Sequence, residues 1–134
     1  MAQNFTKQIV DQKDARLPLC IVDSATSLAV GDGIIGFPIP AFYNGSNITG
    51  AIAIVDMKGI TGQTDIQLRR RRAGVSTDVL STKIILGDVF TAENGVINLA
   101  NDDLATGDVL YCDIDAVHTT PPIGLYLIIT ITKP

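Results

Sequence analysis

The sequence predicts an all-β protein: a β-sandwich of jelly-roll type that follows an extended N-terminal arm. Three observations lead to this prediction. Short runs of alternating apolar and polar residues recur along the chain, as in half-buried strands. Turn signals such as Asp32-Gly33, Asn44-Gly45 and Asn94-Gly95 separate these runs. From Leu17 onward, no segment has the apolar spacing of an amphipathic helix.

Residues 1–16 are expected to form the arm, and residues 17–134 the sandwich domain. The first segment is polar and of mixed charge, with Phe5, Ile9 and Val10 as large apolar side chains. We interpret it as an arm that docks onto neighbouring subunits through these three residues. A frayed terminus is the alternative. The length of 134 residues fits one compact domain.

The expected strands follow in order. Leu17–Val22 contains a proline and is expected at a sheet edge, because proline cannot donate a ladder hydrogen bond. Ile48–Val55 is apolar on both faces, with Ile48, Ile52 and Ile54 on one side, so both faces should be covered. The other expected strands are Ile34–Ile39, Asp65–Arg72, Val79–Leu86, Val96–Leu99, Asp108–Val117 and Gly124–Thr132.

The strand Asp65–Arg72 ends in four consecutive arginines. Its first half places Ile66 and Leu68 toward the core and Asp65 and Gln67 toward solvent. The arginines alternate between the same two faces, and guanidinium groups suit carboxylates. We interpret them as contacts to another subunit or to a host or shell surface, with a solvated strand end and nucleic-acid binding as alternatives. These residues are Arg69, Arg70, Arg71 and Arg72.

The composition and charge exclude several classes of partner. A net charge of −4 argues against general nucleic-acid binding, which needs a basic face. No apolar run approaches the length of a membrane span, and the N-terminus lacks the pattern of a secretory signal. We therefore expect neither nucleic acid nor a membrane as partner. In a reducing cytoplasm, Cys20 and Cys112 are expected to be buried free thiols.

No residue pattern points to catalysis, a cofactor or a metal. The single histidine, His118, lies in a Thr/Pro loop with no nucleophile motif nearby and is expected to be solvated. Asp113 and Asp115 share one strand face but lack the spacing of a calcium loop, so we interpret them as a solvated acidic face. We therefore expect a protein that is not an enzyme. The candidates for an aromatic glycan-binding cluster are Tyr43, Tyr111 and Tyr126.

Several segments resemble small β-sandwich virion proteins of tailed bacteriophages. The pair DIQIRN and VDMLST, common in that family, is similar to segments within Thr64–Arg69 and Asp78–Thr82. The runs at Ala100–Asp108, Asp113–Val117 and Pro121–Leu125 resemble the family pattern ANDDVATGD, IDVDAV and TPPKGL. Upstream, FPIPAFYNGSNITGAIAIV is similar to the family strand IPAELNGYNLV. The chain departs from the family where three of its four arginines replace Asn and small polar residues.

The resemblance implies a structural virion protein, in first place a capsid decoration (cement) protein that binds and stabilises the outside of the head shell. It implies a homotrimer that contacts the major capsid protein or another virion protein. Its place would be the outer surface of the particle, after assembly in the host cytoplasm. A head- or tail-fibre module, or a receptor- or carbohydrate-binding jelly roll, is the alternative.

Overall fold

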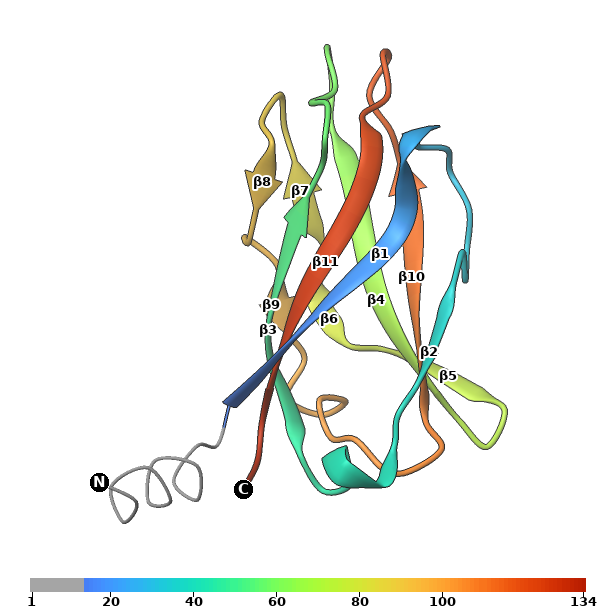
Figure 1. Cartoon of the computed structure of the whole chain (residues 1–134), viewed down its shortest axis with the longest axis vertical. Coiled ribbons are helices and arrows are strands. Elements are labelled where there is room, and N and C mark those ends of the chain that lie inside the picture. Colours follow the sequence, from blue (N-terminus) through green and yellow to red (C-terminus); the bar gives the residue numbers. More distant parts are fainter. Residues whose placement is uncertain (1–13) are drawn as a thin grey trace, which may run out of the picture.

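The computed structural model describes residues 14–134, which form a sandwich of two antiparallel sheets (Figure 1). The first sheet has the order β1 (Asp14–Ser27), β11 (Ile123–Thr132), β3 (Asn47–Ile54) and β8 (Thr91–Ala92). The second sheet has the order β2 (Gly36–Pro38), β10 (Val109–Ala116), β4 (Thr64–Arg72) and β5 (Val75–Asp78), and β7 (Ile84–Leu86) also pairs with β4. A small two-stranded ribbon pairs β6 (Leu80–Thr82) with β9 (Val96–Ile97), and a short 3-10 helix, η1, spans Ala41–Tyr43. The predicted all-β sandwich is confirmed, whereas the jelly-roll connectivity stays a prediction.

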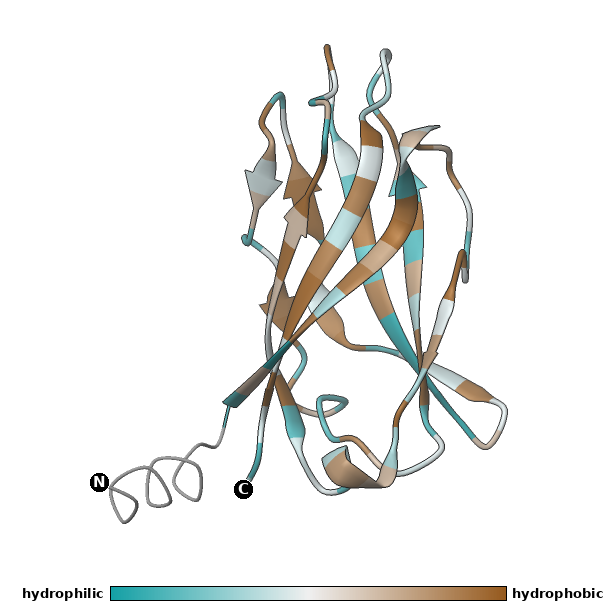
Figure 2. Cartoon of the chain, in the orientation of Figure 1, coloured by the Kyte–Doolittle hydropathy of each residue, from teal (hydrophilic) through white to brown (hydrophobic). Residues whose placement is uncertain are grey.

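The core lies between the two sheets. Leu127 and Ile129 of β11 and Ile66 and Leu68 of β4 are almost completely buried. Figure 2 shows the corresponding alternation of apolar and polar bands along β11 and β10. Burial of each such side chain contributes about 1.5–3 kcal/mol, so this shared layer is the main source of stability. Within residues 14–134, no helix is long and apolar enough to cross a bilayer.

The first strand is an edge strand, as its proline predicts. β1 pairs only with β11 and begins at Asp14, three residues before the expected start. Asp14–Arg16 therefore belong to the sheet. The remaining arm residues, including Phe5, Ile9 and Val10, lie outside the described residues.

The register of β3 differs from the expectation at Ile48. The pairing with β11 shifts between Gly50–Thr130 and Ile48–Ile131, which marks a β-bulge. This shift turns Ile48 to the core side, where it is fully buried. The other two isoleucines of the strand, at 52 and 54, keep their outward orientation and are half-buried.

The expected strand Val79–Leu86 is divided between two partners, since β7 pairs with β4 and β6 pairs with β9. Gln67, expected in solvent, is buried at this division. Its Oε1 accepts a hydrogen bond from the backbone N–H of Leu80 at 3.1 Å, and its Nε2 donates to the Leu80 carbonyl at 3.1 Å. Between β5 and β6, the Gln67 side chain therefore forms the hydrogen bonds that the backbone of a neighbouring strand would otherwise make with Leu80.

Candidate interaction surfaces

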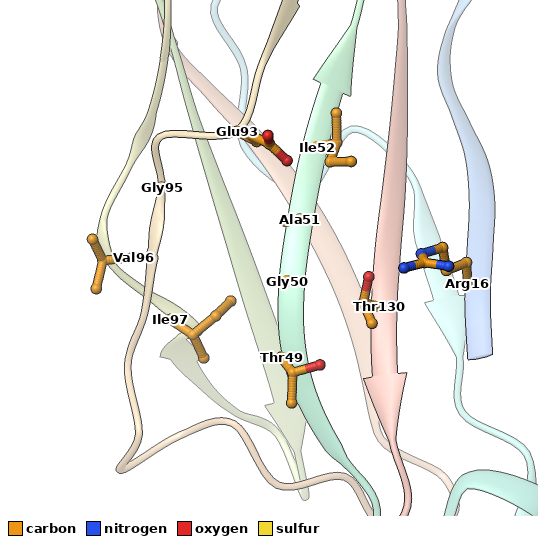
Figure 3. A pocket seen from close by; sticks show the side chains of 10 residues that line it. All are labelled: Arg16, Thr49, Gly50, Ala51, Ile52, Glu93, Gly95, Val96, Ile97 and Thr130. Carbon is orange, nitrogen blue, oxygen red and sulfur yellow. The ribbon is translucent and has the colours of Figure 1, made fainter. Parts of the chain in front are cut away.

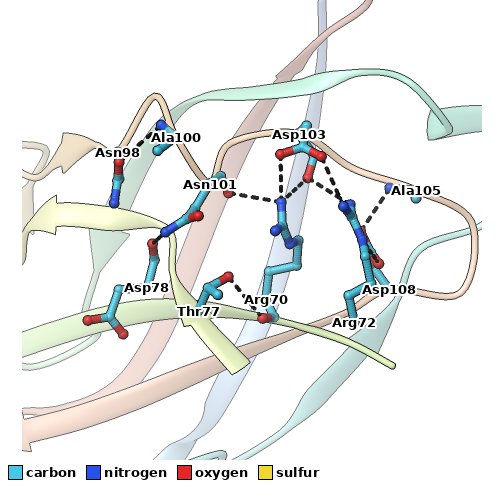
Figure 4. Close-up of polar contacts among 10 residues, drawn as sticks. All are labelled: Arg70, Arg72, Thr77, Asp78, Asn98, Ala100, Asn101, Asp103, Ala105 and Asp108. Carbon is cyan, nitrogen blue, oxygen red and sulfur yellow. Dashed lines mark hydrogen bonds and ion pairs between the residues drawn. The ribbon is translucent and has the colours of Figure 1, made fainter. Parts of the chain in front are cut away.

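Two of the four arginines at the end of β4, Arg70 and Arg72, lie against the loop that leads into β10 (Figure 4). Arg70 is only 7% exposed, and its Nη1 donates to the carboxylate of Asp103 at 2.8 Å and to the Asp103 carbonyl at 2.6 Å. Arg72 donates from Nε and Nη2 to the two carboxylate oxygens of Asp108, at 2.8 and 2.7 Å. These bidentate and charge-assisted bonds fix the loop onto the sheet.

The same contacts shift the ionisation of the two carboxyls. The hydrogen bond from Arg72 lowers the pKa of Asp108, and the backbone N–H of Ala105 lowers it further, although burial acts in the opposite direction. Burial raises the pKa of Asp103, but the hydrogen bonds from Arg70 and Arg72 outweigh it, so this pKa is also lowered. Both carboxylates are therefore stabilised in their charged form in the folded protein.

The other two arginines of the run also have partners in the chain. Arg69 donates from Nη2 to the carboxylate of Asp113 at 3.1 Å. Arg71 lies over the ring of Tyr111, with its guanidinium carbon 4.8 Å from the ring centre. The sequence pattern indicated carboxylate partners on another subunit or surface, whereas Arg69, Arg70 and Arg72 pair with carboxylates of the same chain. A subunit or shell contact by the four arginines stays a prediction.

Asp113 is buried rather than solvated, contrary to the sequence prediction. Its carboxylate accepts the backbone N–H of Gly33 at 2.7 Å in addition to the bond from Arg69. Asp115 pairs with Lys83 at 2.9 Å. With Asp32 these residues form an acidic group whose oxygens lie within 4.8 Å of one another. Because cations of the chain balance two of the three carboxylates, the group fits a structural role.

His118 is also buried, contrary to expectation. Its Nδ1 lies 2.9 Å from the hydroxyl of Thr64, and its Nε2 lies 3.1 Å from a carboxylate oxygen of Asp88. The ring fits closely against Gly59, where a Cβ atom would lie 2.4 Å from it. The order hydroxyl, imidazole, carboxylate resembles a catalytic triad, but Thr64 is fully buried. A substrate cannot reach that hydroxyl, so we assign the three residues to loop packing.

The two cysteines are free, and their environments differ. Cys112 faces the core between Leu110 and Ile114, as predicted, and burial raises its pKa to about 12. Cys20 is exposed, contrary to expectation, because it lies on the outward side of the edge strand, opposite Tyr126. The apolar core therefore protects one thiol and leaves the other accessible.

The outward side of the first sheet carries accessible apolar residues, and we call it the outer face. Side chains opposite one another in neighbouring strands lie on the same face. The register places Pro18 of β1, Ile128 of β11 and Ile52 of β3 in one row. Cys20, Tyr126 and Ile54 form the next row. All six are half-buried or exposed, so this sheet is apolar on both sides.

A hollow of about 530 Å³ lies over the outer face at β3 (Figure 3). Gly50 contributes no side chain here, and Thr130 beside it is small, which leaves space above the strand. Arg16 of β1 lies at one border of the hollow and Glu93, which follows β8, at the other. Both charged side chains are exposed, and neither has an ion pair within residues 14–134.

The three tyrosines do not form one aromatic platform. Tyr43 lies in η1, Tyr111 on β10 of the second sheet and Tyr126 on β11 of the first sheet. Tyr111 is covered by Arg71, and the hydroxyl of Tyr126 donates to Asp56 at 2.9 Å. No observation therefore favours a stacked-sugar site.

Taken together, these observations define an all-β sandwich with exposed apolar and exposed charged side chains on its surface. Comparison with protein-family models, with curated proteins and with solved structures returned no match.

Proposed function

We propose that this chain is a structural protein of a tailed-bacteriophage virion, and specifically a decoration protein that binds and stabilises the outside of the head shell. The observation that carries the proposal is the amount of apolar surface left accessible. Besides the outer face, Leu99, Phe42, Val75 and Val30 are between 63% and 82% exposed. The rows of the outer face are the contiguous part of this surface, because the register places their residues side by side, and contiguous apolar surface marks sites of protein contact. The family resemblance of the sequence supports the same class.

The polar residues of the described part support a role without catalysis. Thr64 and His118 are buried together, and the carboxylates of Asp103, Asp108 and Asp113 are occupied by arginines. These groups hold loops onto the sheets. In this proposal the chain is not an enzyme and uses no cofactor. Its partners are further copies of itself in a homotrimer and the major capsid protein or another virion protein, with no nucleic acid or membrane.

Binding to head shells tests the proposal. Shells from a phage that carries the gene, prepared with the gene deleted, are mixed with the purified chain and sedimented. We expect saturable binding and a higher temperature of shell rupture, because a bound subunit stabilises only the state that it binds. Shells that already carry the protein are the matched control and should bind little more. Failure of the depleted shells to bind the chain would rule out a decoration role.

A further inference from the structure

We infer that the outer face is the contact between copies of this chain, and that three copies pack these faces around a common axis with Arg16 of each beside Glu93 of the next. The number of copies rests on the proposed homotrimer. The choice of face rests on the structure alone.

The first argument is the distribution of apolar residues in the first sheet. A sheet with one solvated side normally alternates apolar-in and polar-out. In this sheet the central strand carries Ile128 on its outward side, between Pro18 and Ile52 of its neighbours. An outward row of this kind is stabilised when a second apolar surface covers it. A second copy offers that surface, since it carries the same row.

The second argument is the position of the charges. Arg16 lies on β1 at one edge of the sheet, and Glu93 follows β8 at the other edge. When the β1 border of one copy meets the β8 border of the next, Arg16 of the first copy lies beside Glu93 of the second. This is a head-to-tail contact, which closes into a ring under cyclic symmetry. In a trimer it gives three Arg16–Glu93 pairs with each guanidinium and each carboxylate used once.

The third argument is the shape of the two borders. The hollow at Gly50 lies beside Glu93 and gives room for side chains of the neighbouring β1 border. Pro18 removes one backbone donor from the edge of β1. This loss disfavours continuation of the sheet into a second copy through hydrogen bonds. The two borders therefore favour packing of faces over pairing of edges.

Charge exchange tests the contact by sedimentation velocity of the full chain at about 1–100 µM. The wild-type chain should sediment with the mass of three copies. Arg16→Glu and Glu93→Arg should each weaken association about tenfold or more, because each creates like-charge contacts. The double variant Arg16→Glu/Glu93→Arg should associate nearly as well as the wild type. An equimolar mixture of the two single variants should recover part of the affinity, since two of three contacts in a mixed trimer regain opposite charges.

Two controls separate association from folding. Lys58→Glu makes the same charge change as Arg16→Glu, but in the loop after β3, and should leave association unchanged. The melting temperature of each charge variant, measured at a concentration where the wild type is monomeric, should stay within about 2 °C of the wild type, as for exposed surface substitutions. Ile128→Lys should abolish association, since it places a charge in the apolar row.

Three results would overturn the inference: a wild-type monomer or dimer at 100 µM, a double variant no better than the single ones, or unchanged association of Ile128→Lys. A chain that fails these tests and still saturates depleted shells leaves the decoration role standing, although a monomer or dimer would also contradict the proposed homotrimer. A trimer that passes them and binds no shell contradicts the proposed function alone.

Discussion

Asp108 connects the loop before β10 to the end of β4. It is 2% exposed, and its carboxylate accepts hydrogen bonds from Arg72 and from the backbone N–H of Ala105. Asp108→Asn removes the charge and keeps the shape. We expect a loss of about 1.5–3 kcal/mol in the free energy of unfolding, the range for hydrogen bonds to charged groups. Urea denaturation measures the loss, and Asp102→Asn, at a position with no ion pair within residues 14–134, should cost little.

Asp108, together with Asp103, should also make the folded protein less stable at acidic pH. The pKa values of Asp103 and Asp108 are lowered in the folded protein. Carboxyls of this kind contribute stability that is fully present above their unfolded pKa of about 3.9 and is lost as the pH falls through the lower folded value. The melting temperature should therefore fall steeply below about pH 4, and less steeply in Asp108→Asn. Identical pH profiles for the two proteins would show that Asp108 does not carry this effect.

The two thiols should react at very different rates. Cys20 is exposed, whereas Cys112 is buried and its pKa is raised to about 12, which removes the reactive thiolate at neutral pH. At a concentration where the chain is monomeric, so that the outer face is uncovered, we expect a maleimide to label one thiol per chain rapidly at pH 7.5, and the second only after unfolding. Peptide mapping identifies the labelled residue. Rapid labelling of Cys112 in the folded chain would contradict the position of β10 in the core.

At the scale of elements, the loops beyond β3 and β10 are joined by the contact between Gly59 and His118. A Cβ at Gly59 would lie 2.4 Å from the imidazole ring, so Gly59→Ala forces the two loops apart. We expect a loss of about 1–3 kcal/mol, typical of overpacking. Gly87→Ala is the matched control, because nothing lies within 4 Å of its added Cβ.

A double-mutant cycle tests this contact by thermal denaturation. Gly59→Ala combined with His118→Ala should cost less than the sum of the single changes, because the clash needs the ring. Strict additivity of the two changes would show that the ring does not meet the added Cβ.

The alternation of residues predicted the fold class and most strands, because each side chain's face follows from its position along the strand. The alternation failed where a local irregularity of the strand, or a partner from a distant part of the chain, determines whether a side chain is buried. The bulge in β3 reverses Ile48, and Gln67 replaces a strand neighbour for Leu80. His118 is buried because Gly59 and Thr64 meet it from another part of the chain. Contacts between residues that are distant in sequence cannot be predicted from the pattern of neighbouring residues.

Contact surfaces were predicted from the sequence only in part. The apolar character of Ile48–Val55 on both faces indicated a strand covered on both sides. In the structure β3 contributes Ile52 to the outer face, and a cover over this face stays a prediction. The run of arginines indicated charged contacts, but it could not show that the carboxylate partners lie in the same chain. The proposed contact between Arg16 and Glu93 of neighbouring copies could not be predicted from neighbouring residues, because only the strand order brings these two residues to opposite borders of one sheet.

For the whole molecule, the segment before β1 should serve assembly rather than folding. Residues 1–13 precede the first described strand, and within residues 14–134 the two sheets bury a core that extends from Ile21 to Ile131. Their deletion should leave the melting temperature of the free subunit within about 2 °C and weaken assembly or shell binding. Calorimetry and co-sedimentation measure the two effects. Unchanged shell affinity of the truncated chain would show that Phe5, Ile9 and Val10 are not contact residues.

The most direct test of the proposed virion role is a density map of the intact particle, resolved well enough to place side chains. We predict copies of this sandwich on the outside of the head shell, in groups of three, with the outer face between copies. Density for the chain elsewhere in the particle would contradict the decoration role. Its absence from purified particles would contradict the proposed virion role.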